Sequence, residues 1–155
     1  MKVIKAPNPF EQELKNYKSS VFLAGSIEEG KAVDWQKKIE VALEKEDVLV
    51  LNPRRNDWDN SWVQKIENKQ FREQVEWELK AQEMAKLIVM YFAPETKAPI
   101  TLLELGLFAK SNKLIVCCPE GFYRKGNVDI VCERYNIIQV PTLDVLISFV
   151  QEMFK

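Results

Sequence analysis

The sequence predicts an open, doubly wound α/β fold, in which a parallel sheet of about five strands carries helices on both faces. Three observations lead to this prediction. Short apolar runs alternate along the chain with longer segments of helical periodicity. Nearly every residue within each short run is apolar, which is typical of strands buried on both faces of a parallel sheet. Right-handed crossovers between such strands then place helices on both sides of the sheet.

The predicted elements follow one another in a regular order. Strands are predicted over residues 20–25, 47–52, 86–92, 114–118 and 137–140. Helices are predicted over residues 31–45, 64–85, 100–111 and 128–135, and from residue 142 onward. Residues 1–18 are polar, carry two prolines and are expected to form a loose arm. We expect residues 1–155 to form a single domain of the Rossmann or flavodoxin type, because the length matches one ordinary domain.

Turn residues and apolar periodicity support these boundaries. The first run ends in the turn-forming pair Gly25-Ser26, and Pro53 stops the second run. The helix over residues 31–45 is predicted from the spacing of its apolar positions, which are Val33, Ile39, Val41, Ala42 and Leu43. In a doubly wound sheet, ligands bind beyond the carboxyl ends of the strands. The loops of interest therefore follow Leu23, Leu51, Phe92 and Cys118.

Composition excludes several classes of function. The chain of 155 residues carries 22 Lys+Arg against 23 Asp+Glu, a net charge of −1, which is unlike a nucleic-acid binder. No apolar run approaches the roughly 20 residues that cross a membrane, and the first residues lack the apolar core of a secretory signal. The three cysteines follow no zinc or disulfide spacing. We therefore expect a cytoplasmic protein with no membrane or nucleic-acid partner.

The absence of histidine restricts the chemistry further. The chain contains no His, which excludes Ser-His-Asp and Cys-His catalysis and every His-ligated metal site. Acid, base and nucleophile must then be chosen from carboxylates, Lys, Tyr, Cys and Ser. We expect no metal and no cofactor.

Glu104 stands out because its surroundings in the sequence are apolar. The segment from Ile100 reads ITLLELGLFA, and on a helical wheel Glu104 lies between Ile100, Leu107 and Phe108. A buried ionised carboxylate needs a reason, because its desolvation is costly. One reason is structural: Thr101-x-x-Glu104 spells a capping box. The other is functional: Glu104 faces the ligand crevice from a helix N-terminus. Both can hold at once.

Glu78 is similarly placed on the preceding predicted helix. Its neighbours on one stripe of that helix are Phe71, Val75, Gln82 and Ala85. A structural interpretation pairs Glu78 with a cation such as Arg54. A functional one directs Glu78 and Glu104 into the same crevice, where two carboxyls without His or metal suggest cleavage of a glycosidic bond.

Two loops carry further candidate residues. Gly25 allows a ligand to approach the backbone, and Ser26 offers a hydroxyl to a sugar or phosphate, although the same pair also suits an ordinary turn. Arg54 lies in the Asn-Pro-Arg-Arg segment, which reads equally as a surface turn. Trp58 and Trp62 are suited to stacking on a flat ligand, or to closing the core or a subunit interface.

The chain resembles the nucleoside 2-deoxyribosyltransferase-like family, which is related to nucleotide N-glycosidases. The resemblance covers roughly residues 20–132 and rests on the order of five short motifs, AGSI, NPRR, WE, LLELG and GN. The most specific part is Glu104–Gly106, preceded by Pro99–Thr101. It implies a small-molecule nucleoside and nucleobase as ligands, and a homo-oligomer.

The resemblance also implies roles for single residues. Glu104 matches the family nucleophile, which forms a covalent deoxyribosyl-enzyme intermediate. Glu78 stands where the family has an Asp that handles the nucleobase as acid and base. Asn127 looks like the family Asn that reaches the sugar in a neighbouring subunit. The residues expected beside the base are Asn52, Arg54 and Asp57.

Several positions depart from the family pattern. Phe22 replaces a frequent Tyr, so the hydroxyl that orients the nucleophile is missing. Ala98 stands where relatives have an Asp or Ser that contacts the 5′ end of the sugar, and Thr101 is a possible substitute. Glu28 follows GSI where nucleotide-hydrolysing relatives carry a basic residue, and its charge would repel a 5′-phosphate.

Together these residues favour a nucleoside over a nucleotide as substrate. The function expected is cleavage of the N-glycosidic bond of a (2′-deoxy)ribonucleoside with transfer of the sugar to another base. Two alternatives stay open. One is a hydrolase, in which water takes the place of the acceptor base. The other is a non-catalytic nucleotide- or base-binding protein, which the departures at Phe22 and Ala98 would suit.

Overall fold

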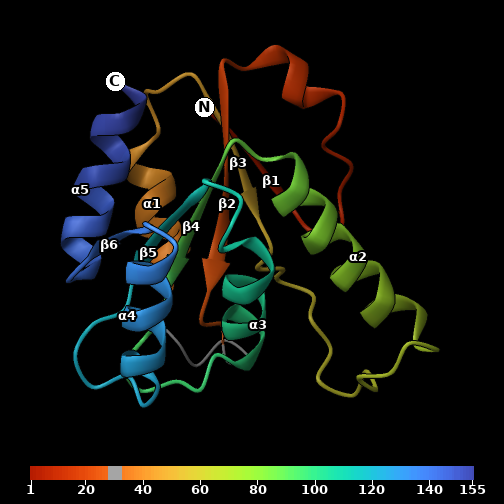
Figure 1. The fold of residues 1–155 in the computed structure, drawn as a ribbon. Coiled ribbons are helices and arrows are strands. Elements are labelled where there is room, and N and C mark those ends of the chain that lie inside the picture. The colour runs from red at the N-terminus through yellow and green to blue at the C-terminus, as the bar shows by residue number, and fades with distance from the viewer. Residues whose placement is uncertain (28–32) are drawn as a thin grey trace.

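A computed structural model describes residues 1–27 and 33–155 of the chain (Figure 1). Six parallel strands form one open sheet in the order β1-β3-β2-β4-β5-β6, which confirms the flavodoxin-like α/β fold. The strands are β1 (Lys2–Lys5), β2 (Ser19–Gly25), β3 (Val48–Asn52), β4 (Leu87–Tyr91), β5 (Leu114–Cys117) and β6 (Ile138–Val140). The five predicted strands are all present, each within about a residue of its expected ends.

Helices cover both faces of the sheet. The α-helices are α1 (Trp35–Ala42), α2 (Lys69–Met84), α3 (Pro99–Phe108), α4 (Lys125–Arg134) and α5 (Leu143–Phe154). Helices α1 and α5 pack on one face through residues such as Ile39 and Val150. Helices α2, α3 and α4 pack on the other through Ala81, Leu105 and Val128 (Figure 1). The strands β3 and β4 are buried at every position, as their continuous apolar sequences require.

The first residues are not the loose arm that their polarity predicts. Residues Lys2–Lys5 form β1, which pairs in parallel with β3 at the edge of the sheet. A single turn of 3-10 helix, η1 (Glu13–Asn16), follows. Phe10 is only 1% exposed, and the indole N–H of Trp77 donates to the carbonyl of Asn8 at 2.7 Å. The prediction of a loose arm was wrong. β1 forms because the edge of β3 is free to pair with it, and the sequence of residues 2–5 does not reveal this pairing.

The order of the strands reverses between β2 and β4, and at this switch point the chain packs closely against itself. A Cβ atom added to Gly25 would lie 2.5 Å from the carbonyl oxygen of Tyr91 and 2.6 Å from Trp35 Cζ2. Gly25 is therefore required by the packing of the chain against itself. The Ser26 N–H donates to the Tyr91 carbonyl at 3.1 Å, and its hydroxyl accepts from the Ala93 N–H at 3.1 Å.

Ser26 is also bonded to the loop that follows β4. Its Oγ lies 2.6 Å from Thr96 Oγ1, and Thr96 Oγ1 donates to the Ala93 carbonyl at 2.9 Å. These contacts fasten the loop after β2 to the loop that leads into α3. The side chain of Ser26, which is 1% exposed, thus holds the scaffold together at the point where a ligand hydroxyl was expected. None of the helices in the described ranges is long and apolar enough to cross a membrane.

The close approach at Gly25 leads to a stability prediction. Gly25→Ala is expected to lower the free energy of unfolding by about 1–3 kcal/mol, because the methyl group meets backbone and an aromatic ring that cannot both retreat. Urea denaturation followed by circular dichroism measures this. Gly126→Ala is the control: its Cβ meets nothing within 4 Å, so stability should stay constant or rise slightly. Equal stability of the two variants would contradict the packing role.

Candidate active site

Glu78 and Glu104, from helices α2 and α3, approach each other on one face of the sheet. Gln82 joins them: its Nε2 donates to Glu104 Oε1 at 2.8 Å and to the backbone carbonyl of Glu78 at 3.3 Å. Glu104 is 7% exposed and Gln82 is fully buried. The negative charge of Glu78 also acts on the Glu104 carboxyl, so the two acids that the sequence singles out lie near each other.

Glu104 owes its position to the start of α3. Pro99 occupies the first turn, where its missing N–H costs nothing, and Ala98 before it is left-handed with φ of 44°. The helix therefore begins two residues before Thr101, and the capping box expected between Thr101 and Glu104 is not formed. Thr101 is instead buried inside the first turn of α3. Glu104 lies in the middle of the helix, facing α2.

Glu78 lies at the edge of the buried stripe of α2. The stripe differs from the predicted one: Val75 is 36% exposed, whereas Trp77, Ala81 and Gln82 are buried. The ion pair expected with Arg54 is also not seen. Among the described residues, the Glu78 carboxylate has no cationic partner, and its Oε1 accepts instead from Gln74 Nε2 at 2.6 Å.

Desolvation without a nearby cation raises the pKa of both acids strongly. Desolvation raises the pKa of Glu78 to about 7, against the lowering effect of the Gln74 hydrogen bond. Desolvation and then the negative charge of Glu78 raise the pKa of Glu104 to about 8, while Gln82 lowers it. Because the carboxyls influence each other, these values describe the pair. Between the two pKa values the pair carries one proton and one negative charge, and the higher pKa of Glu104 leaves that proton on Glu104 in the free protein.

The loop after β3 is attached to Glu78 through Gln74. Gln74 Nε2 also donates to the Pro53 carbonyl at 2.9 Å, and its Oε1 accepts from Arg55 Nη1 at 3.4 Å. Arg55 in turn forms two hydrogen bonds with the carboxylate of Asp57, which holds the pKa of that acid below its usual range. The loop is thus fixed at its base.

Two half-buried tryptophans lie on this loop. The rings of Trp58 and Trp62 meet edge to face with their centroids 5.0 Å apart. The guanidinium of Arg55 lies 5.0 Å from the centre of the Trp62 ring. Because Arg55 also contacts Gln74, the aromatic pair is connected to the helix that carries Glu78.

The other residues of the Asn-Pro-Arg-Arg segment contact α1. Asn52 is 2% exposed and donates to Glu40 Oε1 at 2.7 Å, while its own oxygen accepts from the Arg54 N–H. Arg54 Nη1 lies 3.3 Å from Gln36 Oε1 and 3.7 Å from Asp34 Oδ1. These contacts tie the end of β3 to α1, on the opposite side from the two acids.

The remaining expected site residues are dispersed. Phe22 is fully buried beside Trp77, with ring centroids 6.3 Å apart, on the face that α2 and α3 cover. Asn127 is exposed in the first turn of α4, as a residue that reaches another subunit must be. Glu28 lies outside the described residues. Gln74 and Gln82 were not expected in the site, although each lies one turn from Glu78 on α2 and this spacing could have indicated them.

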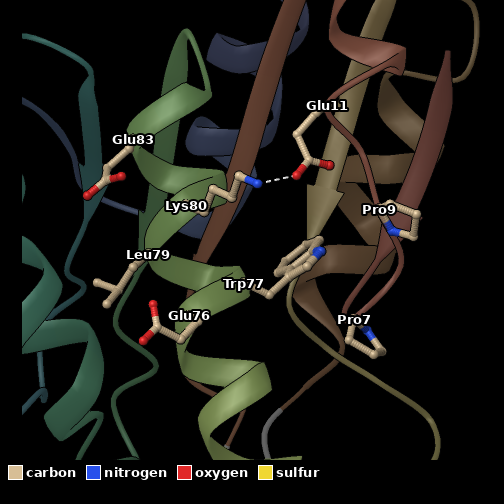
Figure 2. Close-up of a pocket in the computed structure, with 8 residues that line it drawn as sticks. All are labelled: Pro7, Pro9, Glu11, Glu76, Trp77, Leu79, Lys80 and Glu83. Carbon is tan, nitrogen blue, oxygen red and sulfur yellow. Dashed lines mark hydrogen bonds and ion pairs between the residues drawn. The ribbon is translucent and has the colours of Figure 1, made fainter.

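A groove of about 490 Å³ lies along the other side of α2 (Figure 2). Pro7, Pro9 and Glu11 face Trp77 and Lys80 across it, and Lys80 is paired with Glu11. Neither Glu78 nor Glu104 lines this groove. Its carboxylates are paired or solvated, so it lacks the proton-sharing acids that mark the candidate active site.

The fold and the acid pair together define a flavodoxin-like α/β protein with a paired-carboxyl site. The chain belongs to the family described as Nucleoside 2-deoxyribosyltransferase like, whose model matches residues 18–122. That match confirms the family that the short motifs indicate and contains both acids. A comparison with curated proteins found no match.

The raised pKa values predict an unusual dependence of stability on pH. The folded state binds protons at Glu78 and Glu104 more tightly than the unfolded state, whose carboxyls titrate near 4.5. The free energy of unfolding should therefore fall, on the order of a few kcal/mol, as the pH rises from about 5 to about 8. Glu104→Gln should flatten this slope, as urea denaturation across the pH range would show. Glu83→Gln, at an exposed position of α2, is the control, and parallel curves for Glu104→Gln and the parent would contradict the shared proton.

Proposed function

We propose that the protein transfers the sugar of a (2′-deoxy)ribonucleoside from one nucleobase to another, with Glu104 as the nucleophile and Glu78 as the acid and base. The observation that supports this most directly is that two acids without a cationic partner among the described residues lie close enough for the charge of Glu78 to raise the pKa of Glu104, whose carboxylate is held by Gln82. Such a pair serves glycosidic-bond chemistry, in which one carboxylate attacks and the other carries a proton.

In the first half-reaction, the shared proton moves from Glu104 to Glu78, and an oxygen of the ionised Glu104 carboxylate forms a bond with C1′ of the nucleoside. The bond between C1′ and the base nitrogen breaks, and the Glu78 carboxylic acid donates its proton to the departing base. The transition state resembles an oxocarbenium ion, and its positive charge is stabilised by the carboxylate beside it. The products are a glycosyl ester on Glu104, an ionised Glu78 and a free base.

The second half-reaction reverses these roles with a different base. A nitrogen of the acceptor base attacks C1′ while Glu78 removes its proton, and the bond from C1′ to Glu104 breaks. The carboxylate of Glu104 and the protonated Glu78 are restored. Transfer prevails over hydrolysis only if water is kept from the ester. We assign the base-stacking role to Trp58, with Arg54, Asp57 and Asn52 in the surrounding segment.

The preference for a nucleoside and the need for a second subunit belong to the same proposal. Glu28, next to the GSI motif, would repel a 5′-phosphate. Asn127 is exposed on α4 and available to a neighbouring sugar site, in line with the role that the family motif implies. Gly25, Ser26, Phe22 and Thr101 are assigned to the support of the substrate site in this proposal.

The proposal predicts the fate of a nucleoside given a second base. Incubation with 2′-deoxyinosine and adenine should yield 2′-deoxyadenosine, detected by chromatography, and Glu104→Gln should abolish the product. Glu83→Gln, on the exposed side of α2, should keep the parent rate. Free sugar and base alone would mean that the protein is a hydrolase. A Glu104→Gln variant that retains activity, or a parent protein without turnover, would contradict the proposal.

The shared proton predicts the pH dependence of the reaction. Below the first pKa of the pair both carboxyls are protonated and the nucleophile is lost; above the second both are ionised and the acid is lost. Plotted against pH, kcat/KM should therefore be bell-shaped, with its maximum between about 7 and about 8. Initial rates in buffers of constant ionic strength test this.

The acid role of Glu78 predicts that its loss affects the rate according to the leaving group of the substrate. Glu78→Gln should slow nucleosides with poor leaving groups by about 100-fold or more and spare those whose base leaves without a proton. The comparison uses 2′-deoxyinosine against a 2′-deoxyribosyl donor with an activated leaving group. Equal losses on both substrates would contradict an acid role.

A further inference from the structure

Gln82 is a buried amide that contacts Glu104 but takes no part in the bond-making and proton-transfer steps proposed above. It lies one turn after Glu78 on α2 and is fully buried. Both of its N–H groups are used, one by the Glu78 backbone carbonyl and one by Glu104 Oε1. Its own oxygen, Oε1, has no hydrogen-bond partner among the described residues.

The orientation of this amide follows from its neighbours. The Glu78 carbonyl and the Glu104 carboxylate are both acceptors, so the reverse orientation would place the Gln82 oxygen against two other oxygens. The amide therefore presents a donor to Glu104. This leaves the Gln82 oxygen buried and unpaired, an arrangement that a purely structural residue would avoid, because an apolar side chain fills such a position without losing a hydrogen bond.

The contact also distinguishes the two oxygens of Glu104. Oε1 is held at 2.8 Å by Gln82, whereas Oε2 receives no hydrogen bond from the described part of the chain. A carboxylate held by one oxygen keeps its plane and leaves the other oxygen available to form a bond. Phe22, whose side chain has no hydroxyl to offer, lies on the same face of the sheet.

We infer that Gln82 is the positioning residue for the nucleophile: its amide holds Glu104 Oε1 so that Oε2 faces C1′ of the sugar. This inference rests on the proposed function. The amide is a neutral donor, so it orients the carboxylate without forming an ion pair. The charged group that acts on Glu104 within the described residues is Glu78, from α2, and Gln82 opposes its effect.

Gln82→Met tests this role, because it keeps the length of the side chain and removes the donor. We expect kcat to fall by about 100-fold with KM changed by less than about threefold, since the ground-state contacts to the sugar and base remain. The basic limb of the profile of kcat/KM against pH should move to higher pH, because Glu104, which has the higher pKa of the pair, loses the donor that favours its charged form. Gln82→Asn, whose amide is one methylene too short, should behave in the same way.

Stability distinguishes positioning from a structural role. At about pH 6, where Glu104 carries its proton, Gln82→Met should keep or raise the Tm, because it removes an unpaired buried oxygen. Gln70→Met, the same substitution at an exposed position of α2, should leave kcat, KM and Tm unchanged. A large drop in Tm that accompanies the loss of rate in Gln82→Met would assign Gln82 to the core and overturn the inference.

The outcomes separate this inference from the proposed function. If the parent protein transfers the sugar, Glu104→Gln does not, and Gln82→Met retains the parent kcat and pH profile, only the role of Gln82 is wrong. If the parent protein forms no product, or Glu104→Gln remains active, the proposed function fails and the role of Gln82 fails with it. A lower kcat with a basic limb shifted to higher pH and an unchanged Tm supports both.

Discussion

The site depends on the direction of two crossovers in the parallel sheet. The chain passes from β3 to β4 and from β4 to β5 in the same sense across the sheet. Because such crossovers are right-handed, the two intervening helices, α2 and α3, lie on the same face. Side chains that precede and follow β4 in the sequence are thereby brought together. Glu78 and Glu104 meet because of the strand order, with no local interaction between them in the sequence.

What surrounds the two acids decides their chemistry. A buried carboxylate beside Lys or Arg is held ionised, whereas burial without a cation raises its pKa. Here the nearest hydrogen-bond donors are the amides of Gln74 and Gln82, which are neutral. They fix the geometry of the carboxyls without neutralising them. An ion pair would have given a stable helix contact, but it would have removed the proton that acid–base chemistry needs.

The polar residues around the switch point of the sheet have a different task. Ser26 and Thr96 bind each other and the backbone, and Asn52 binds Glu40 on α1. These contacts hold the carboxyl ends of β2, β3 and β4 in place. The loop after β3 is attached to α2 through Gln74, so its tryptophans and the acid Glu78 share one support. The loop with the two tryptophans and the carboxyl of Glu78 are therefore held by the same side chain, Gln74.

The sequence by itself determined most of the fold. Continuous apolar runs identify the four inner strands, β2, β3, β4 and β5, because a strand covered on both faces must be apolar at every position. The same reasoning identifies Glu104 and Glu78, since a carboxyl within an apolar segment has a desolvation cost that calls for a purpose. Local patterns also misled: Thr101-x-x-Glu104 reads as a capping box, yet the proline before it starts the helix earlier. Short-range signals compete, and the sequence does not show which one prevails.

Only the tertiary structure decided the rest. Lys2–Lys5 becomes a strand because β3 offers an unpaired edge, and strand pairing joins residues far apart in the chain. The partners of Glu78 and Glu104 were equally hidden, since a side chain of Gln or Arg reaches several positions and packing selects one. Gln82 contacts Glu104 because α2 and α3 lie side by side on the sheet. The sequence singled out Glu78 and Glu104 but not the buried Glu40, whereas the tertiary structure determined that the first two lie near each other, and that amides rather than cations hold them.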